Sequence, residues 1–545
     1  MPNQNQVPQV NTLHEVLIWP LQVIAPNAGD PNLDHWKFLQ GTSGQNPWKE
    51  LPCTFNGPPH SFKKQYYKEF VTFLPYVQRF LYGENTGSTG YGNSPIHVFH
   101  HSEVAQVRLT FQQEIAPITL SVERADLLFF YDIDIIILIV EVVGKDLPLP
   151  VAQEILFRFG RTYPAFWEPD GRAGQCFKQV EWLDRAGQVL ATSDYEDRDK
   201  YLDNVGKYRS PAISQHWEYL LRPLALHQTA GRNVLGYRQI EYHRMPLMAY
   251  LSVEDPKTLT RADFVRLALI TRSGDSEQLP YSEAALADFE QQYCYDRFWD
   301  PHAPHGTLNS RYLCCGHAFL VVGKSSESFF TDPEIGVLGQ FRHQYFLMCL
   351  IPHFHKAALH LFSEQLITAI SHLDIHQTES LKKFKQEIRN IFSNFLRFTH
   401  RYWFHEVSNQ AQARDMFKML TTQLGTSQLY ADINEELKEM NQYLESDDLR
   451  RQAETVVRLT VVMTLSIIGT VTTGFLGMNL LNLSENAIPT KFLFFLAVLI
   501  PTTILTLYTV LKSKAFSEFL DALSHEGLDW KNKLHSLTKI WLNRS

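Results

Sequence analysis

Two long apolar runs near the C-terminal end constrain this chain more than any other feature. Residues 456–476 carry a single charge, Arg458, close to their start, and residues 492–511 carry none. Each run is long enough to cross about 30 Å of hydrocarbon as a helix. The sequence therefore predicts two transmembrane helices, 456–479 and 492–511, joined by an external loop over 480–491.

Charges beside these runs predict the orientation. Arg450 and Arg451 lead into the first run and Lys512 and Lys514 follow the second, whereas Glu485 is the single acid of the loop. By the positive-inside rule both termini are cytoplasmic. The first residues lack the pattern of a signal peptide. The predicted location is the inner (plasma) membrane, as a multi-pass protein.

The rest of the composition is that of a chain that folds in water. Of the 545 residues 20% are charged, and the net charge of -8 argues against a nucleic-acid polymer as partner. Six cysteines without CxxC spacing predict neither a disulfide framework nor a structural zinc site. No cofactor motif or catalytic constellation stands out, so the chain is not expected to be an enzyme.

Residues 1–335 are predicted to form an α/β domain with a mixed sheet and helices. The apolar run 127–143 contains Asp132, Asp134 and Glu141. Charged groups are costly at the centre of a bilayer, so this run is interpreted as two buried strands separated near Asp132 rather than as a third span. Residues 311–324 are predicted to be a further strand.

Residues 336–455 are predicted to be helical. A stretch over 341–370 is expected to break at Pro352. A stalk helix starts near Ser427 and reaches Asn479, 53 residues or about 80 Å. Its apolar seam has the spacing of a helix that packs on copies of itself or on neighbours: Ile433, Leu437, Met440 and Leu444.

The tripeptide Gly477-Met478-Asn479 ends the first apolar run. In this position the chain resembles the CorA family of divalent-cation channels, in which Gly-Met-Asn ends the first of two C-terminal membrane helices. The resemblance covers about residues 376–514. Without it, the tripeptide would be interpreted as a helix C-terminal cap.

The resemblance implies a funnel-shaped homopentamer in the lipid bilayer that passes hydrated divalent cations. Mg²⁺ is the expected cargo, with Co²⁺ and Ni²⁺ as further cations, and Mg²⁺ is also a candidate regulatory ion. A ring of Asn479 side chains would offer uncharged oxygens to the hydration shell at the pore mouth. Gly477 would let the backbone leave the helix there.

Counting back from the signature at helical spacing gives one face, which by resemblance lines the pore and includes a hydrophobic gate: Gly474, Thr470, Ile467, Met463, Thr460 and Val456. The alternative is that this face meets lipid or the second helix. Helix phase read from a sequence is uncertain by about one residue.

Three features depart from the family pattern. The loop has lost the usual Met-Pro-Glu and keeps Glu485 as its acid, and Ala453 stands where some members carry a second pore asparagine. The basic tail 512–545 is longer than usual. It has an apolar helical face suited to the inner leaflet: Trp530, Leu534, Leu537 and Trp541.

Other candidate metal ligands have weaker support. Three histidine groups are close in sequence, although 22 histidines make close pairs common: His97, His100 and His101; His302 and His305; His353, His355 and His360. Acids that could bind regulatory Mg²⁺ by resemblance could equally form a solvated helix face: Glu435, Glu436, Glu439, Asp447 and Asp448.

Three other functions stay open at this point. One is a Zn²⁺ transporter of the same architecture. Another is a ligand-gated membrane effector, in which the large N-terminal part binds a signal such as a nucleotide. The third is an enzyme that the two helices only tether to the membrane.

Overall fold

A computed structural model describes residues 7–24, 35–40, 46–51, 64–83, 96–130, 133–230, 234–240, 244–274, 279–302, 309–374, 378–478 and 488–511. The chain divides into two compact units, Met1–Lys438 and Glu439–Ser545. Each unit is described by itself.

The first unit is built on a mixed sheet, in which 14 strands are seen among the described residues. The main path runs β12-β13-β14-β11-β1-β6-β5-β4-β7-β8. The strands are β1 (Gln9–Ile24), β2 (Trp48–Leu51), β3 (Ile96–His101), β4 (Gln106–Thr110), β5 (Ile118–Phe130), β6 (Ile135–Pro148), β7 (Gln179–Leu183), β8 (Val189–Thr192), β9 (Ala225–Leu226), β10 (Gly236–Gln239), β11 (Leu247–Val253), β12 (Cys294–Tyr295), β13 (Arg311–Cys314) and β14 (Ala318–Lys324).

Helices precede, cover and follow the sheet. They are α1 (Lys37–Gln40), α2 (Lys64–Thr72), α3 (Pro75–Tyr82), α4 (Leu149–Arg158), α5 (Arg198–Tyr208), α6 (Gln215–Leu221), α7 (Arg261–Leu269), α8 (Glu283–Tyr293), α9 (Ser328–Thr331), α10 (Val337–Gln340), α11 (Phe346–Ser371), α12 (Thr378–Arg401), α13 (Ala411–Leu424), α14 (Thr426–Gly477) and α15 (Ile488–Leu511). Short 3₁₀ turns η3 (Pro256–Thr258) and η4 (Asp296–Phe298) and a π-helical turn η5 (Phe341–Tyr345) complete the set.

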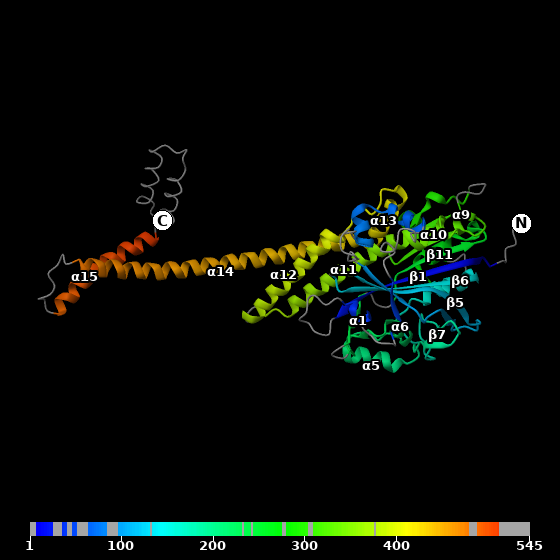
Figure 1. Cartoon of the computed structure of the whole chain (residues 1–545), viewed down its shortest axis with the longest axis horizontal. Coiled ribbons are helices and arrows are strands. Elements are labelled where there is room, and N and C mark those ends of the chain that lie inside the picture. Colours follow the sequence, from blue (N-terminus) through cyan, green and yellow to red (C-terminus); the bar gives the residue numbers. More distant parts are fainter. Residues whose placement is uncertain are drawn as a thin grey trace. The chain divides into compact units, whose positions relative to one another are not determined.

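Strand β1 is the centre of the sheet (Figure 1). It pairs antiparallel with β6, β11 and β10, while β11 and β14 run parallel. Parallel and antiparallel neighbours thus share one sheet, which confirms the predicted mixed α/β fold class.

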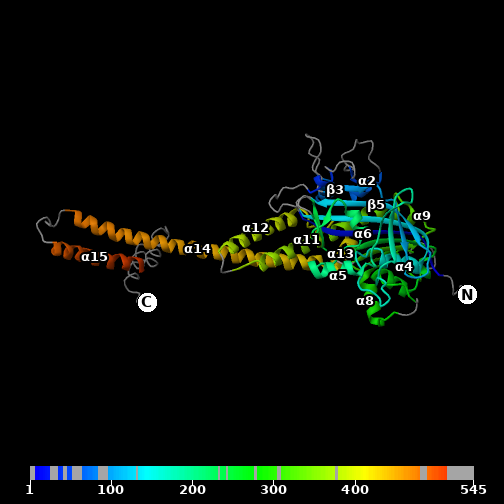
Figure 2. The same ribbon diagram turned by 90° about the horizontal axis from the view of Figure 1, so that it is seen from below.

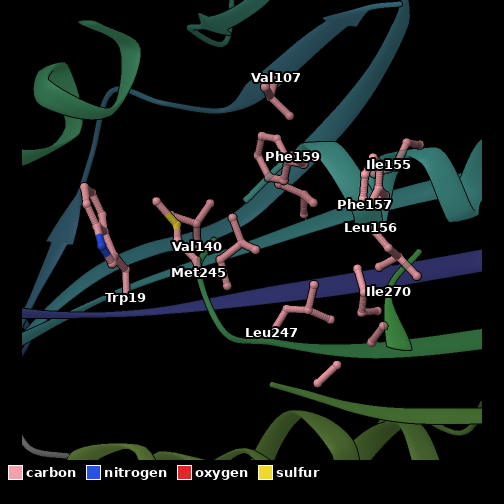
Figure 3. Packing of buried hydrophobic residues seen from close by; sticks show 14 of the residues in the cluster. Trp19, Val107, Val140, Ile155, Leu156, Phe157, Phe159, Met245, Leu247 and Ile270 are labelled. Carbon is pink, nitrogen blue, oxygen red and sulfur yellow. The ribbon is translucent and has the colours of Figure 1, made fainter. Parts of the chain in front are cut away.

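The two faces of the sheet are covered by different helices. Side chains alternate along a strand, and Leu13 and Leu17 of β1 join the main apolar core together with Ile155 and Leu156 of α4. Figure 3 shows these α4 side chains beside Val140 of β6 and Leu247 of β11. Helix α11 also contacts β1 and β6 and is seen among the strands in Figure 2, but its buried residues do not belong to the core that α4 joins. The sheet is therefore buried on both faces, as its apolar strands require.

The run 127–143 forms two strands, as predicted. β5 ends at Phe130 and β6 begins at Ile135, and the two pair with each other. Asp132 lies outside the described residues.

Glu141 shows how a charge is accommodated inside this sheet. Its carboxylate is 1% exposed and lies 3.2 Å from His14 Nδ1, 3.2 Å from Arg124 Nε and 2.8 Å from Arg342 Nε. Burial alone would raise the pKa of Glu141, but the hydrogen bond with His14 and the charges of Arg124 and Arg342 lower it to about 2. Because Arg342 belongs to η5, this network also fixes the turn that leads into α11.

Two local predictions were wrong. Helix α11 continues through Pro352, because the cost of about 3 kcal/mol for an internal proline is exceeded by the burial of neighbours such as Ile351 and Phe354. Residues 311–324 form two strands of a hairpin rather than one. Gly316 has a φ of +74 between them, a turn conformation that glycine adopts readily.

A second buried acid, Glu15, has no such partners among the described residues. It lies on β1 on the face of Leu13 and Leu17, it is 0% exposed, and neither carboxylate oxygen has a hydrogen-bond partner in the part of the chain that the structure describes. Burial raises the pKa of Glu15 well above its ordinary value. The folded protein therefore keeps this side chain protonated to a higher pH than the unfolded chain does.

Replacing Glu15 with methionine is expected to stabilise the protein increasingly as the pH rises above about 4.5. The unfolded chain releases the Glu15 proton there and the folded chain retains it, so wild-type stability falls by about 1.4 kcal/mol per pH unit up to the folded pKa. Thermal melts of both proteins at pH 4.5, 6 and 7.5 measure this, and the low-pH comparison is the control. A Tm difference independent of pH would contradict it.

Candidate pore helices

The second unit contains two apolar helices that are exposed rather than buried. The candidate spans are Leu459–Gly477 in α14 and Ile488–Tyr508 in α15, and 11% and 0% of their most apolar stretches are buried. Core helices of a soluble domain are mostly buried, and a signal sequence lies near the N-terminus, so these two helices resemble neither. Their length and composition suggest a membrane protein.

The boundaries differ slightly from the prediction. α14 covers 52 residues, from Thr426 to Gly477, close to the expected stalk helix. α15 begins at Ile488, so residues 488–491 belong to the helix rather than to the loop. Pro489 explains this, because proline is favoured in the first turn of a helix.

The side-chain hydroxyl groups along α14 donate hydrogen bonds to backbone carbonyls of the same helix. Six Ser and Thr side chains donate to the carbonyl four residues earlier, at 2.7–2.9 Å: Thr460, Thr464, Ser466, Thr470, Thr472 and Thr473. Polar side chains are tolerated in hydrocarbon when their donors are used in this way. These residues thus leave the segment compatible with a span.

One polar contact sets the rotation of α14 against α15. Thr472 Oγ1 lies 3.1 Å from Thr502 Oγ1, and Thr472 is 1% exposed. Thr464, Ile468 and Leu476, spaced four residues apart around it, are partly covered. Both ribbon views place α15 beside the end of α14 (Figures 1 and 2). The face of Thr472 is therefore the one that meets α15.

The predicted pore face points away from this contact. At about 100° per residue, all six predicted residues lie within about 60° of the direction opposite Thr472. Val456, Met463 and Ile467 are 61%, 60% and 53% exposed, and Thr460, Thr470 and Gly474 are also exposed. A side chain at Gly474 would point into open space as far as the described residues go. Among the described residues of a single chain, this face does not contact α15, whereas the face of Thr472 does. The role of the predicted face as a pore lining stays a prediction.

The signature lies at the end of α14. Gly477 is the last helical residue, and Met478, 64% exposed, follows with its N–H directed to the Phe475 carbonyl at 3.4 Å. Asn479 and Glu485 lie outside the described residues, as does the tail 512–545. The chain leaves the helix directly after Gly477.

The first histidine group is distributed over separate partners. His97 lies 3.1 Å from Glu50 and stacks on Trp36, and His100 lies 2.8 Å from Asp126.

His101 is buried against Trp48, and burial lowers its pKa to about 4. Across the described part of the chain, no three His, Cys, Asp or Glu residues are grouped to hold a metal. His305 is outside that part.

The acids considered as candidates for regulatory Mg²⁺ lie along α14. Glu435, Glu436 and Glu439 are exposed on α14, in agreement with a solvated helix face. Nothing is described of the side chains of Asp447 and Asp448.

The structure assembles one constellation that the sequence did not indicate. Ser214 Oγ donates to Asp194 at 2.9 Å and lies 2.9 Å from His216 Nδ1. Lys200 and Tyr201 also bind Asp194. Asp194 and Ser214 are 20 positions apart in the sequence, so no local pattern indicates that they come together.

These residue types match a hydrolase triad but their order does not. In a triad the histidine lies between the carboxylate and the serine, whereas here the serine lies between the other two. Ser214 and His216 are 0% exposed, and burial lowers the pKa of His216 to about 3. The network orients the start of α6 and gives no support for a tethered enzyme.

Comparisons with known proteins add little. No family model and no curated protein matches the sequence. Among solved structures, a CorA magnesium transporter from Methanocaldococcus jannaschii is 14% identical, and the match covers 50% of this chain and 93% of that one, with a TM-score of 0.19.

Proposed function

We propose that this chain is a membrane channel or transporter for hydrated divalent cations, with Mg²⁺ as the main cargo and Co²⁺ and Ni²⁺ as further cations. One observation carries the proposal: α14 presents a continuous exposed face opposite its α15 contact, and the helix ends at Gly477, the first residue of the sequence Gly-Met-Asn. A second span follows immediately. Copies of the chain, five by family resemblance, would close this face around an axis with their termini in the cytoplasm.

The chemistry of this face suits a hydrated ion. Thr460 and Thr470 already donate their hydroxyl hydrogens to the helix backbone, so their free lone pairs can accept hydrogen bonds from the water shell of a cation. Mg²⁺ gives up its water reluctantly. Met463 and Ile467 would form apolar rings between these polar levels, and Val456 would form a further ring on the other side of Thr460. Such rings close by dewetting when narrow.

Cysteine scanning in proteoliposomes tests the pore face. Purified wild-type chain is expected to pass Mg²⁺ into vesicles without an added ligand. Treatment with a cationic thiol reagent is expected to reduce flux through Thr470→Cys at least about tenfold, because the modified side chain places a positive charge on the ion path. Thr472→Cys, two residues away and covered by α15, is the matched control.

Two outcomes would contradict the proposal. Block at Thr472→Cys but not at Thr470→Cys would place the pore on the other face. Absence of flux in wild-type vesicles for Mg²⁺, Co²⁺, Ni²⁺ and Zn²⁺ alike would favour the ligand-gated effector, and flux of Zn²⁺ alone would favour the zinc transporter.

A further inference from the structure

Three segments meet at the end of the sheet where β11 and β14 begin. The Met245 N–H donates to the Gly160 carbonyl at 2.9 Å, and Arg161 and Arg244 pair as an antiparallel bridge. The Leu247 N–H donates to the His317 carbonyl at 3.0 Å. Because β11 and β14 are parallel neighbours with Leu247 opposite Ala318, the residues just before both strands lie side by side. Two arginines and a histidine are thereby brought together.

The two arginines bring positive charge into a buried region. Arg161 is 3% exposed, and its Nε donates to the Phe157 carbonyl at 3.1 Å. One guanidinium nitrogen of Arg244 donates to the Ile270 carbonyl at 2.8 Å. Burial, followed by the charge of Arg244, lowers the pKa of Arg161 to about 10. Within the described ranges no carboxylate lies at ion-pair distance from Arg244, and a carbonyl does not cancel its charge.

His317 adds a polar atom without a partner. Its Nε2 is buried, and no hydrogen-bond partner for it exists among the described residues. Burial lowers the pKa of His317 well below its ordinary value, and the charges of Arg244, His353, Arg161 and Lys356 lower it further. His353 and Lys356 belong to α11. Basic groups from four segments of the chain therefore act on one another here.

Such a cluster is costly in the folded protein. Like charges repel strongly where water is excluded, and a buried polar atom without a partner costs about 1–3 kcal/mol. Both costs disappear when an anion binds. Arginine forks suit carboxylate and phosphate, but a carboxylate has two oxygens, whereas a phosphate group has enough oxygens to meet donors from three directions.

We propose that Arg161, Arg244 and His317 form a binding site for the phosphate group of a small ligand, with Lys356 of α11 beside it. The site lies in the first unit and is independent of the proposed ion path. It takes either free phosphate or a phosphate ester such as a nucleotide.

Calorimetric titration of the full-length chain in detergent tests this site, with inorganic phosphate and AMP as probes and chloride at matched ionic strength as the blank. Wild type is expected to bind at least one probe saturably. Arg244→Gln and His317→Asn are expected to weaken that binding at least about tenfold. Arg185→Gln, at an exposed turn residue, is the matched control and is expected to bind as wild type does.

A second readout separates binding from a structural role. Without probe, Arg244→Gln should melt at the same temperature as wild type or higher, because it removes a repelled charge. Tighter binding of AMP than of phosphate would identify an ester, and the reverse would identify free phosphate. Unchanged affinity in both variants, or no binding of either probe at millimolar concentration, would overturn the proposal whether or not the chain conducts ions.

Discussion

Vesicles carrying the Asn479→Ala chain are expected to take up Mg²⁺ at least about tenfold more slowly than wild-type vesicles. Each copy of the chain would lose one amide oxygen that meets the hydration shell, worth about 1 kcal/mol per hydrogen bond, and the loss repeats around the ring. A tenfold lower rate corresponds to about 1.4 kcal/mol. The loss of this hydrogen bond in only about two subunits would therefore be enough to slow uptake tenfold. Stopped-flow fluorescence of an encapsulated Mg²⁺ dye measures the rate.

Asn482→Ala is the matched control, since it removes the same side chain three residues later in the loop. It is expected to keep nearly wild-type uptake. Unchanged uptake in Asn479→Ala would show that the tripeptide is not the selectivity site, and equal loss in both variants would assign the effect to the loop as a whole.

Glu141→Gln is expected to lower the free energy of unfolding by about 3 kcal/mol or more at pH 7. Breaking a buried ion pair by removing one partner leaves an uncompensated charge. Here Arg124 and His14 lose their anion, and Arg342 loses the nearer of its two carboxylates. Thermal or denaturant melts followed by tryptophan fluorescence measure the change.

The stability that Glu141 contributes should also depend on pH, which gives a second test of this prediction. The folded pKa of Glu141 is lowered to about 2, so its contribution is fully present above the unfolded value near 4.5 and is lost as the pH falls towards 2. Wild type and Glu141→Gln should therefore converge in acid.

Glu123→Gln is the control for the Glu141 variant. Glu123 also approaches Arg342, at 3.6 Å, but is 41% exposed, and exposed ion pairs contribute about 1 kcal/mol or less. A similar loss of stability in both variants would contradict the argument that burial makes Glu141 important.

Short-range patterns predicted much of this fold. The charges in 127–143 separated two buried strands from a membrane span, and apolar length identified α14 and α15. The partners of Glu141 could not be predicted in the same way, because His14 is 127 residues away and Arg342 lies on an irregular turn. The proposed phosphate site could not be predicted from the sequence for the same reason, because only strand pairing brings Arg161, Arg244 and His317 together.

The predicted pore face came from helical spacing together with the family resemblance, and the structure adds that this face lies opposite the contact of Thr472 with α15. Thr472 is one of several threonines in this helix, so the sequence does not distinguish it from Thr470 or Thr473. Its contact with Thr502 distinguishes it in the structure.

The Thr472–Thr502 contact also limits how such a pore could open. Turning α14 about its own axis would separate the two hydroxyls in a medium without water to replace the contact. It would also carry Ile467 and Thr470 away from the axis together. If α14 and α15 tilt together, the Thr472–Thr502 contact is kept, and Ile467 and Thr470 still face the axis. We therefore expect the apolar rings to widen when the paired helices tilt outwards without rotating.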